Sequence, residues 1–267
     1  MKTSIQLYNK LKQTVELFYS QLKLNKFEKT KGRKLAIKII DVISLGTFKH
    51  LNGIPTKKAL YKIFQPKCSY KTLVVNLNRF AQLALIVISV LLKINQKEAS
   101  LIKHTDSTDL PVCLNKNANH HKTMKFLSSW VKNGKGWFYG LKLHITSDLK
   151  KKILAIRFTS ANACDSKVFM ELNKNLNGIF VADGGYVSKD LQIEFYRENE
   201  RIVFIAPRKN MKKIITAWQF YLYNTRMLIE LNFRNLKMFH NLITSLPRSM
   251  NGYLANYTYS LLSYLIS

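Results

Sequence analysis

The chain has 267 residues, which is long enough to bury a sizeable core in one large domain or two smaller ones. It carries 43 lysine and arginine residues against 15 aspartate and glutamate residues, and the formal net charge of +28 favours a polyanionic partner, nucleic acid above all. The longest apolar run, residues 81–92, is too short to span a bilayer, so we expect a buried helix and no membrane association. Cys68, Cys113 and Cys164 lack paired spacing, which excludes a disulfide framework or a zinc knuckle and indicates a reducing cytoplasm.

The first hundred residues follow a helical pattern throughout. Apolar residues recur at three- and four-residue steps over residues 5–22 and again over residues 35–43, which is the period of one helix face. Thr56 is placed to cap a short helix to residue 64, and Ser69 to cap a long one to residue 93. We therefore predict an all-α region over residues 1–97.

The two capped helices resemble a helix-turn-helix near residues 56–92. In such a unit the second helix enters the major groove, and here it begins with polar and basic residues that include Lys71 and Arg79. A plain helical bundle with a basic surface fits the same residues equally well. Residues 95–100 form the best candidate for a linker to the rest of the chain.

The period changes from residue 101 onward. We predict a strand that ends at Asp106, a loop through Asp109, and a mobile basic loop over residues 115–135. Strict alternation over residues 136–145, a turn, and a second strand over residues 152–159 predict an antiparallel hairpin.

The next elements alternate between helix and strand. A helix is expected over residues 165–176, a strand over 179–182 that ends at Asp183, a helix over 189–199 and a strand over 202–206. A basic loop with Arg208 and Lys209 follows. This order predicts an α/β domain, residues 98–267, in which helices flank a mixed sheet and carboxylates stand at the ends of two strands.

A long helix with one polar face completes this domain. Thr216 and Gln219 have capping-box spacing, and residues 214–245 contain no glycine or proline, so we expect one continuous helix. Tyr223, Arg226, Glu230 and Lys237 form the pattern Y-x2-R-x3-E-x6-K and fall within an arc of about 60° on that helix. A solvated polar stripe is the alternative interpretation of these four residues.

These motifs together carry a resemblance to a known family. Asp106 in H-T-D-S, Asp183 in A-D-G-G-Y and Glu230 in the helical pattern resemble the acidic triad of bacterial insertion-sequence transposases of the DDE type. The chain is similar to members in which an N-terminal helical region precedes a ribonuclease-H-like catalytic domain. The resemblance covers residues 101–260 well and is only general in the first hundred residues.

The resemblance implies a fold, a reaction and a set of partners. It implies a ribonuclease-H-like sheet, recognition of terminal inverted repeats, and cleavage and strand transfer of double-stranded DNA by a dimer or larger assembly in the bacterial cytoplasm, at the nucleoid. Asp106, Asp183 and Glu230 would hold two Mg²⁺ or Mn²⁺ ions. The residues expected on the DNA are Tyr223, Arg226, Lys237, Arg208 and Lys209.

Physical chemistry agrees with this assignment. Breaking a phosphodiester bond needs an activated oxygen nucleophile and neutralisation of charge on the phosphate, and two hard divalent ions about 4 Å apart supply both. Three converging carboxylates repel one another, and metal ions relieve that repulsion. We expect Asp165 to cap a helix and His144 to be a structural histidine.

Two other functions fit the same sequence. One is a catalytically silent or regulatory DNA-binding protein derived from a transposase. The other is a ribonuclease-H-like nuclease in repair or RNA degradation.

Overall fold

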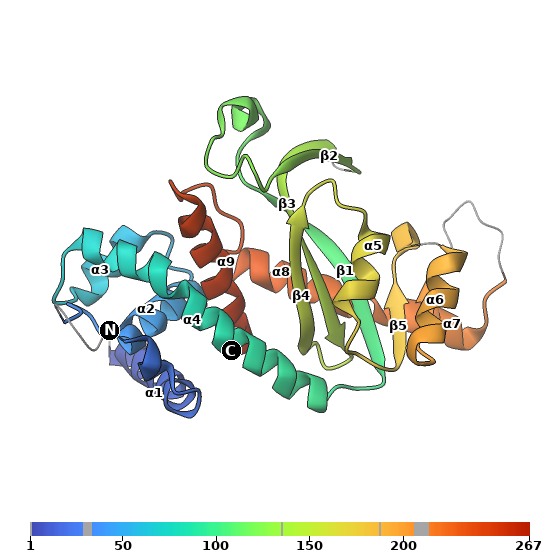
Figure 1. The fold of residues 1–267 in the computed structure, drawn as a ribbon, viewed down its shortest axis with the longest axis horizontal. Helices are drawn as coiled ribbons and strands as arrows, with labels where there is room; N and C mark the ends of the chain where they lie inside the picture. Colours follow the sequence, from blue (N-terminus) through green and yellow to red (C-terminus); the bar gives the residue numbers. More distant parts are fainter. Residues whose placement is uncertain (1, 29–33, 135, 187, 206–213) are drawn as a thin grey trace. The chain divides into compact units, whose positions relative to one another are not determined.

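The computed structural model describes residues 2–28, 34–134, 136–186, 188–205 and 214–267. The chain forms two compact units, each of which is described by itself (Figure 1). The first, here called the helical unit, contains residues 1–91 and 235–267, and the second, here called the sheet unit, contains residues 92–234. The boundaries expected from the sequence, residues 1–97 and 98–267, stay a prediction.

The helical unit is built from both ends of the chain. Helix α9 packs on α2, and the contact is close: a Cβ atom added at Gly46 would lie 2.7 Å from the ring of Tyr259. The Tyr259 hydroxyl donates to the carbonyl of Leu77 at 3.1 Å, which ties α9 to α4 as well. The elements are α1 (Lys2–Gln21), η1 (Leu24–Phe27), α2 (Ile39–Leu51), α3 (Lys57–Phe64), α4 (Tyr70–Lys97, which continues into the sheet unit) and α9 (Met250–Leu265).

The predicted caps of α3 and α4 are confirmed. The Thr56 hydroxyl accepts from the amide of Ala59, and the Ser69 hydroxyl accepts from the amide of Thr72. Helix α4 is longer than expected and, by length and composition alone, is long and apolar enough to cross a membrane. Half of its apolar window is buried inside the protein, and a single helix of this kind is weak evidence for a membrane span.

The sheet unit contains a curled six-stranded mixed sheet flanked by helices, and the expectation of an α/β domain is confirmed to that extent (Figure 1). The strand order is β2-β3-β1-β5-β6, with β4 also paired to β3. Strands β1, β3 and β4 are antiparallel neighbours, as the predicted hairpin requires, whereas β1, β5 and β6 run parallel. The strands are β1 (Ile102–Pro111), β2 (Ser129–Asn133), β3 (Gly136–Asp148), β4 (Ile153–Ser160), β5 (Ile179–Ala182) and β6 (Ile202–Ile205).

Helices α5 and α6 bury an aromatic core against this sheet. Phe169, Phe180 and Phe195 meet edge to face with ring centroids 5.0–6.1 Å apart, and all three are fully buried. The helical elements of the sheet unit are η2 (Asn115–His120), α5 (Asp165–Leu172), η3 (Gly184–Tyr186), α6 (Lys189–Asn199), α7 (Ala217–Thr225) and α8 (Met227–Met238, which ends in the helical unit).

Three local predictions for this unit are wrong. Strand β1 does not end at Asp106 but continues through Asp109 to Pro111, because β3 supplies a ladder along its whole length. The stretch 115–135 is not only a loop, since β2 pairs with the first half of β3 and the rings of Trp130 and Tyr139 lie 5.5 Å apart across the two strands. Residues 95–100 are not a free linker, because the last turn of α4 donates side-chain hydrogen bonds to β4 carbonyls.

The expected continuous helix is interrupted at Arg226. The capping box of Thr216 and Gln219 is confirmed, but α7 ends at Thr225 and α8 begins at Met227. The Thr225 hydroxyl donates to the carbonyl of Leu222 at 2.7 Å, a back-bond that bends helices. A ring nitrogen of His104 on β1 lies 2.9 Å from the same hydroxyl, so the bend is fastened to the sheet.

Candidate catalytic site

Two aspartates stand side by side where a parallel ladder ends. The last pair between β1 and β5 joins Thr105 to Ala182. The next residue of β1 is Asp106, and the residue that directly follows β5 is Asp183. Adjacent strands lie about 4.8 Å apart, which places both carboxylates at one end of the parallel part of the sheet. The sequence prediction that these two residues are brought together is therefore consistent with the register, although Asp106 lies inside β1 and not at its end.

The turn after Asp183 is anchored in the core. The amide of Tyr186 donates to the carbonyl of Asp183 at 3.0 Å, which closes the short helix η3. The Tyr186 ring is buried and lies 5.6 Å from the ring of Phe169. The chain thus leaves β5 in a fixed direction, while the Asp183 residue itself stays exposed.

Arg226 connects the third acidic residue to this pair. Its guanidinium donates to a carboxylate oxygen of Asp106 at 2.9 Å and to one of Glu230 at 2.9 Å. The Asp106 side chain is 18% exposed and that of Glu230 is 58% exposed. The bend between α7 and α8 therefore brings a residue of α8 to the carboxylate in the middle of β1.

The electrostatics of Asp106 reflect its burial first and nearby like charge second. The pKa of Asp106 is raised to about 6, mainly by burial and to a smaller extent by the carboxylates of Asp183 and Glu230. The Ser107 amide, which donates to Asp106 at 2.8 Å, and the Arg226 guanidinium act in the opposite direction. Asp106 therefore sits where an additional cation would be favourable.

The donor set suits a hard divalent cation. Carboxylate oxygens are the ligands that Mg²⁺ and Mn²⁺ prefer, and Asp106, Asp183 and Glu230 interact electrostatically. Among the described residues, no three acidic, histidine or cysteine side chains already surround one ion position. Arg226 contacts two of the three carboxylates, through one oxygen of each.

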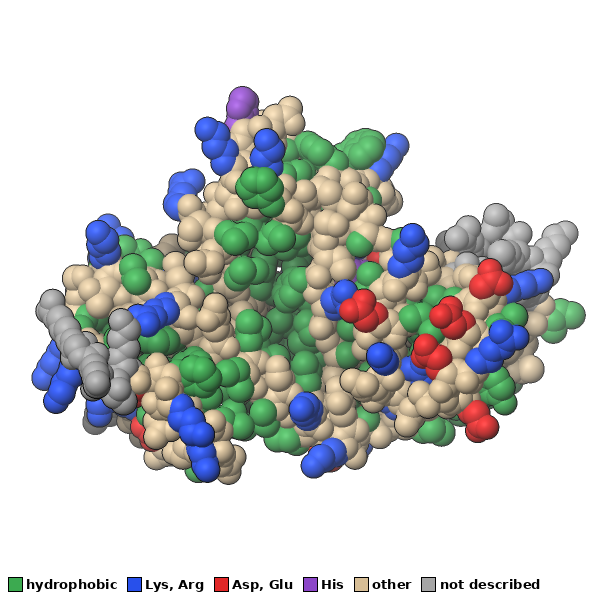
Figure 2. All heavy atoms as spheres, in the orientation of Figure 1, with side chains coloured by type: hydrophobic (Ala, Val, Ile, Leu, Met, Phe, Trp, Pro, Cys, Tyr) green, Lys and Arg blue, Asp and Glu red, His purple; other side chains and the backbone are tan. Residues whose placement is uncertain are grey.

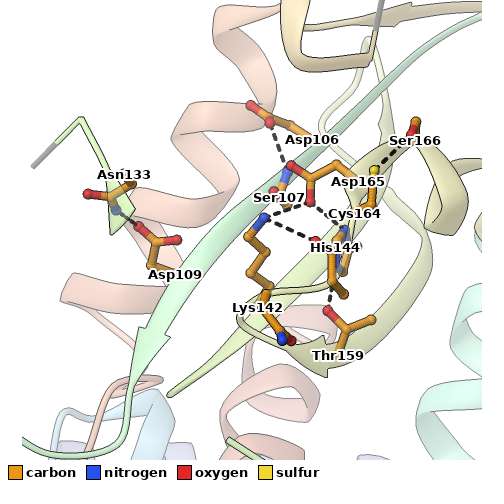
Figure 3. A network of polar contacts seen from close by, with 12 residues as sticks. Asp106, Ser107, Asp109, Asn133, Lys142, His144, Thr159, Cys164, Asp165 and Ser166 are labelled. Atoms are coloured by element: carbon orange, nitrogen blue, oxygen red, sulfur yellow. Dashed lines mark hydrogen bonds and ion pairs between the residues drawn. The ribbon is translucent and has the colours of Figure 1, made fainter. Parts of the chain in front are cut away.

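A second polar cluster lies beside Asp106 (Figure 3). Lys142 on β3 donates to Asp165 at 3.0 Å, and the His144 ring nitrogen lies 3.9 Å from the same carboxylate. Burial lowers the pKa of His144 to about 4, and its other ring nitrogen lies 2.8 Å from the Thr159 hydroxyl. The prediction of a structural histidine is consistent with these contacts.

Asp165 is a member of this cluster and not a helix cap, contrary to expectation. The N-cap position of α5 is Cys164, and Asp165 is the first helical residue. Lys142 and His144, its partners in this cluster, lie two residues apart and therefore on one face of β3, and this spacing is the signal that the sequence offers. Asp109, the other carboxylate of β1, accepts a hydrogen bond from the side chain of Asn133 (Figure 3).

The residues predicted to contact DNA are dispersed. The Tyr223 hydroxyl donates to the carbonyl of Ile205 at 3.1 Å, which gives this residue a structural contact on β6. Lys237 lies seven residues after Glu230 on α8, within the helical unit, as do the exposed Lys71 and Arg79 of α4. Arg208 and Lys209 lie outside the described residues.

Acidic residues are concentrated in one part of the sheet unit. Residues 165–200 hold seven of the fifteen aspartates and glutamates. Figure 2 shows most of the acidic side chains visible on this face in the part of the sheet unit that contains α5 and α6, among lysines and arginines. The helical unit, by contrast, has nineteen lysines and arginines and only three acidic residues.

These features define a class of protein in which carboxylates gather at the end of a parallel ladder of a mixed sheet. A comparison with protein families matches residues 96–250 to the Transposase DDE domain, and the chain belongs to that family. The matched range contains Asp106, Asp183 and Glu230. A comparison with curated proteins gives no match. The chain therefore contains the domain of DDE transposases, a class that acts on DNA and generally uses divalent metal ions.

Proposed function

We propose that this protein is the transposase of a bacterial insertion sequence, which binds the terminal inverted repeats and carries out Mg²⁺-dependent strand cleavage and strand transfer. The observation that carries the proposal is the placement of Asp106 and Asp183 directly after the last pair of one parallel ladder, with Glu230 linked to Asp106 through Arg226. The mixed sheet, with antiparallel strands first in the chain and parallel strands after them, supports a ribonuclease-H-like fold.

The three carboxylates would hold two divalent ions. Bound ions of this kind activate water or a 3′-hydroxyl and neutralise the charge that develops on the phosphate. The sheet fixes the positions of Asp106 and Asp183, whereas the Glu230 side chain is exposed and can change its rotamer. Glu230 is therefore the residue that completes the ligand set.

Arg226 would have two positions. In this structure it neutralises Asp106 and Glu230, and its side chain is 23% exposed. If it left these carboxylates, the guanidinium would be able to bind a DNA phosphate through two parallel hydrogen bonds. Lys237, on α8, would bind a second phosphate.

The helical unit would bind the element's ends. Its excess of basic residues supplies the charge that a DNA surface attracts, and α3 and α4 are two consecutive helices with capped starts, the order of elements in a helix-turn-helix. Lys71 and Arg79 are exposed and available to phosphates. Joining two ends requires a dimer or a larger assembly on DNA.

The proposal is tested by cleavage of a labelled duplex that carries the element's own end. The parent protein should release the 3′ end with Mg²⁺ and not with EDTA, and Glu230→Gln should bind the duplex without cutting it. Glu194→Gln makes the same change at an exposed position on α6 and should cut at the parental rate. Binding without cleavage in every protein would favour the silent or regulatory alternative, and cutting of RNA in RNA–DNA hybrids, without a need for the element's end, would favour the nuclease.

A further inference from the structure

The helical unit contains a pocket that the proposed reaction does not use. It encloses about 350 Å³ and lies between the starts of α3, α4 and α9. None of the described residues that line it is acidic. Its basic and amide side chains are those of Lys49, Lys57, Arg248, Asn78 and Asn256, and its apolar wall is formed by Pro55, Tyr70, Val74, Leu246 and Pro247.

Lys49 is the unusual member of this lining. It is 6% exposed, and its ammonium group makes no hydrogen bond or ion pair among the described residues. Burying most of a lysine side chain without a partner for its charge is unfavourable by general solvation arguments, so a counter-ion would stabilise it. Burial and the neighbouring Lys57 both lower the pKa of Lys49, to about 8, and an anion in the pocket would relieve both effects.

Two further features of the pocket favour an anion. Lys57 is held in place because its ammonium group donates to the side chain of Asn78 at 2.6 Å. Thr56 and Ser249 are the N-caps of α3 and α9, so the positive ends of two helices meet here. A group that accepts hydrogen bonds and carries at least one negative charge would satisfy this end of the site.

The rest of the lining restricts the class of anion. The cavity is far larger than an inorganic ion needs and falls at the lower end of the range for small-molecule sites. The ring of Tyr70 and the side chains of Val74 and Pro247 offer an apolar wall suited to a flat base or a sugar. We propose that the pocket binds a nucleoside phosphate, with the phosphate on Lys49 and Lys57 and the nucleoside against the apolar wall.

Thymidine 5′-monophosphate is the probe, measured by calorimetry on the full chain. It should bind the parent protein, and thymidine without the phosphate should bind at least about tenfold more weakly, as expected when charged hydrogen bonds are lost. Lys49→Met should weaken the nucleotide at least about tenfold, and Lys57→Gln should do the same. Lys58→Met, an exposed lysine of α3 that does not line the pocket, should change the affinity by less than about twofold.

Two further measurements distinguish a nucleotide that is part of DNA from a free nucleotide. If it belongs to DNA, Lys49→Met also weakens a duplex carrying the element's end, and thymidine 5′-monophosphate competes with that duplex. If it is a free nucleotide, the duplex binds parent and variant equally. Asp183→Ala should bind the nucleotide like the parent, so a failure of the proposed catalysis leaves this test intact.

The inference is overturned if the parent binds no thymidine 5′-monophosphate at millimolar concentration. It is also overturned if folded Lys49→Met and Lys57→Gln proteins, checked by circular dichroism, bind it as tightly as the parent.

Discussion

Removing the Arg226 side chain should destabilise the sheet unit, and most of the effect should come from a single ion pair. The bond to Asp106 is partly buried, and charged hydrogen bonds of this kind contribute about 1.5–3 kcal/mol. The bond to Glu230 is an i,i+4 pair with an exposed partner, worth about 0.3–0.5 kcal/mol. Arg226→Gln should therefore lower the free energy of unfolding by about 2–3 kcal/mol in EDTA.

Urea unfolding followed by tryptophan fluorescence measures this loss. All three tryptophans, Trp130, Trp137 and Trp218, belong to the sheet unit, so the signal reports on that unit. Arg234→Gln, at an exposed arginine of α8, should change the free energy by no more than about 0.5 kcal/mol. Saturating Mg²⁺ should shrink the Arg226→Gln loss, because metal ions then neutralise the carboxylates.

A double-mutant cycle isolates the pair. Arg226→Gln combined with Asp106→Asn in EDTA should give a coupling energy of about 1.5 kcal/mol or more. A coupling below about 0.5 kcal/mol would refute the reasoning, since contact-dependent coupling exceeds that value. A loss that is equally large with and without Mg²⁺ would refute the exchange of Arg226 for metal ions.

The remaining predictions concern the helical unit. Burial lowers the pKa of His50 to about 3, and the His50 ring donates a hydrogen bond to the carbonyl of His240. The unfolded chain therefore takes up the proton at a higher pH than the folded protein does, and stability should fall as the pH drops below about 6.5. Between pH 7 and pH 5 the parent should lose about 2 kcal/mol more than His50→Gln in urea unfolding followed by far-UV circular dichroism, and equal losses would contradict this. Gly46→Ala should lower the free energy of unfolding by about 1–3 kcal/mol, because the added Cβ would overlap the Tyr259 ring, whereas Gly134→Ala, with nothing within 4 Å, should be near neutral. DNA affinity should fall steeply with salt, and Arg79→Gln should reduce the slope of log affinity against log salt by about 0.9, so an unchanged slope would remove Arg79 from the interface.

Local patterns in the sequence predict local structure well. Alternation predicts the hairpin of β3 and β4, and the spacing of Thr56, Ser69 and Thr216 from their amide donors predicts three helix starts. The bounds of β5 agree with the same kind of pattern, and so does β6 from Ile202 to Ile205, after which the predicted residue 206 lies outside the described residues.

Contacts distant in sequence explain what could not be predicted. Arg226 reaches Asp106 across 120 residues, and no period in the sequence encodes that ion pair. The extension of β1 to Pro111 depends on β3, which pairs with polar residues that by themselves indicate a loop. The bend at Arg226 depends on His104, whose contact to Thr225 spans 121 residues.

The helical unit is assembled from two segments that the sheet unit separates in the chain, and this determines when the helical unit can fold during synthesis on the ribosome. Helix α2 leaves the ribosome early, but its partner α9 follows the sheet unit in the chain, so the close contact of Tyr259 with Gly46 forms only after the whole sheet unit has been translated. A product that stops after residue 249 contains every acidic residue of the candidate site, yet it lacks the helix that closes the basic unit. Gene copies interrupted just before the codons of α9 would therefore yield chains with intact carboxylates and an incomplete helical unit.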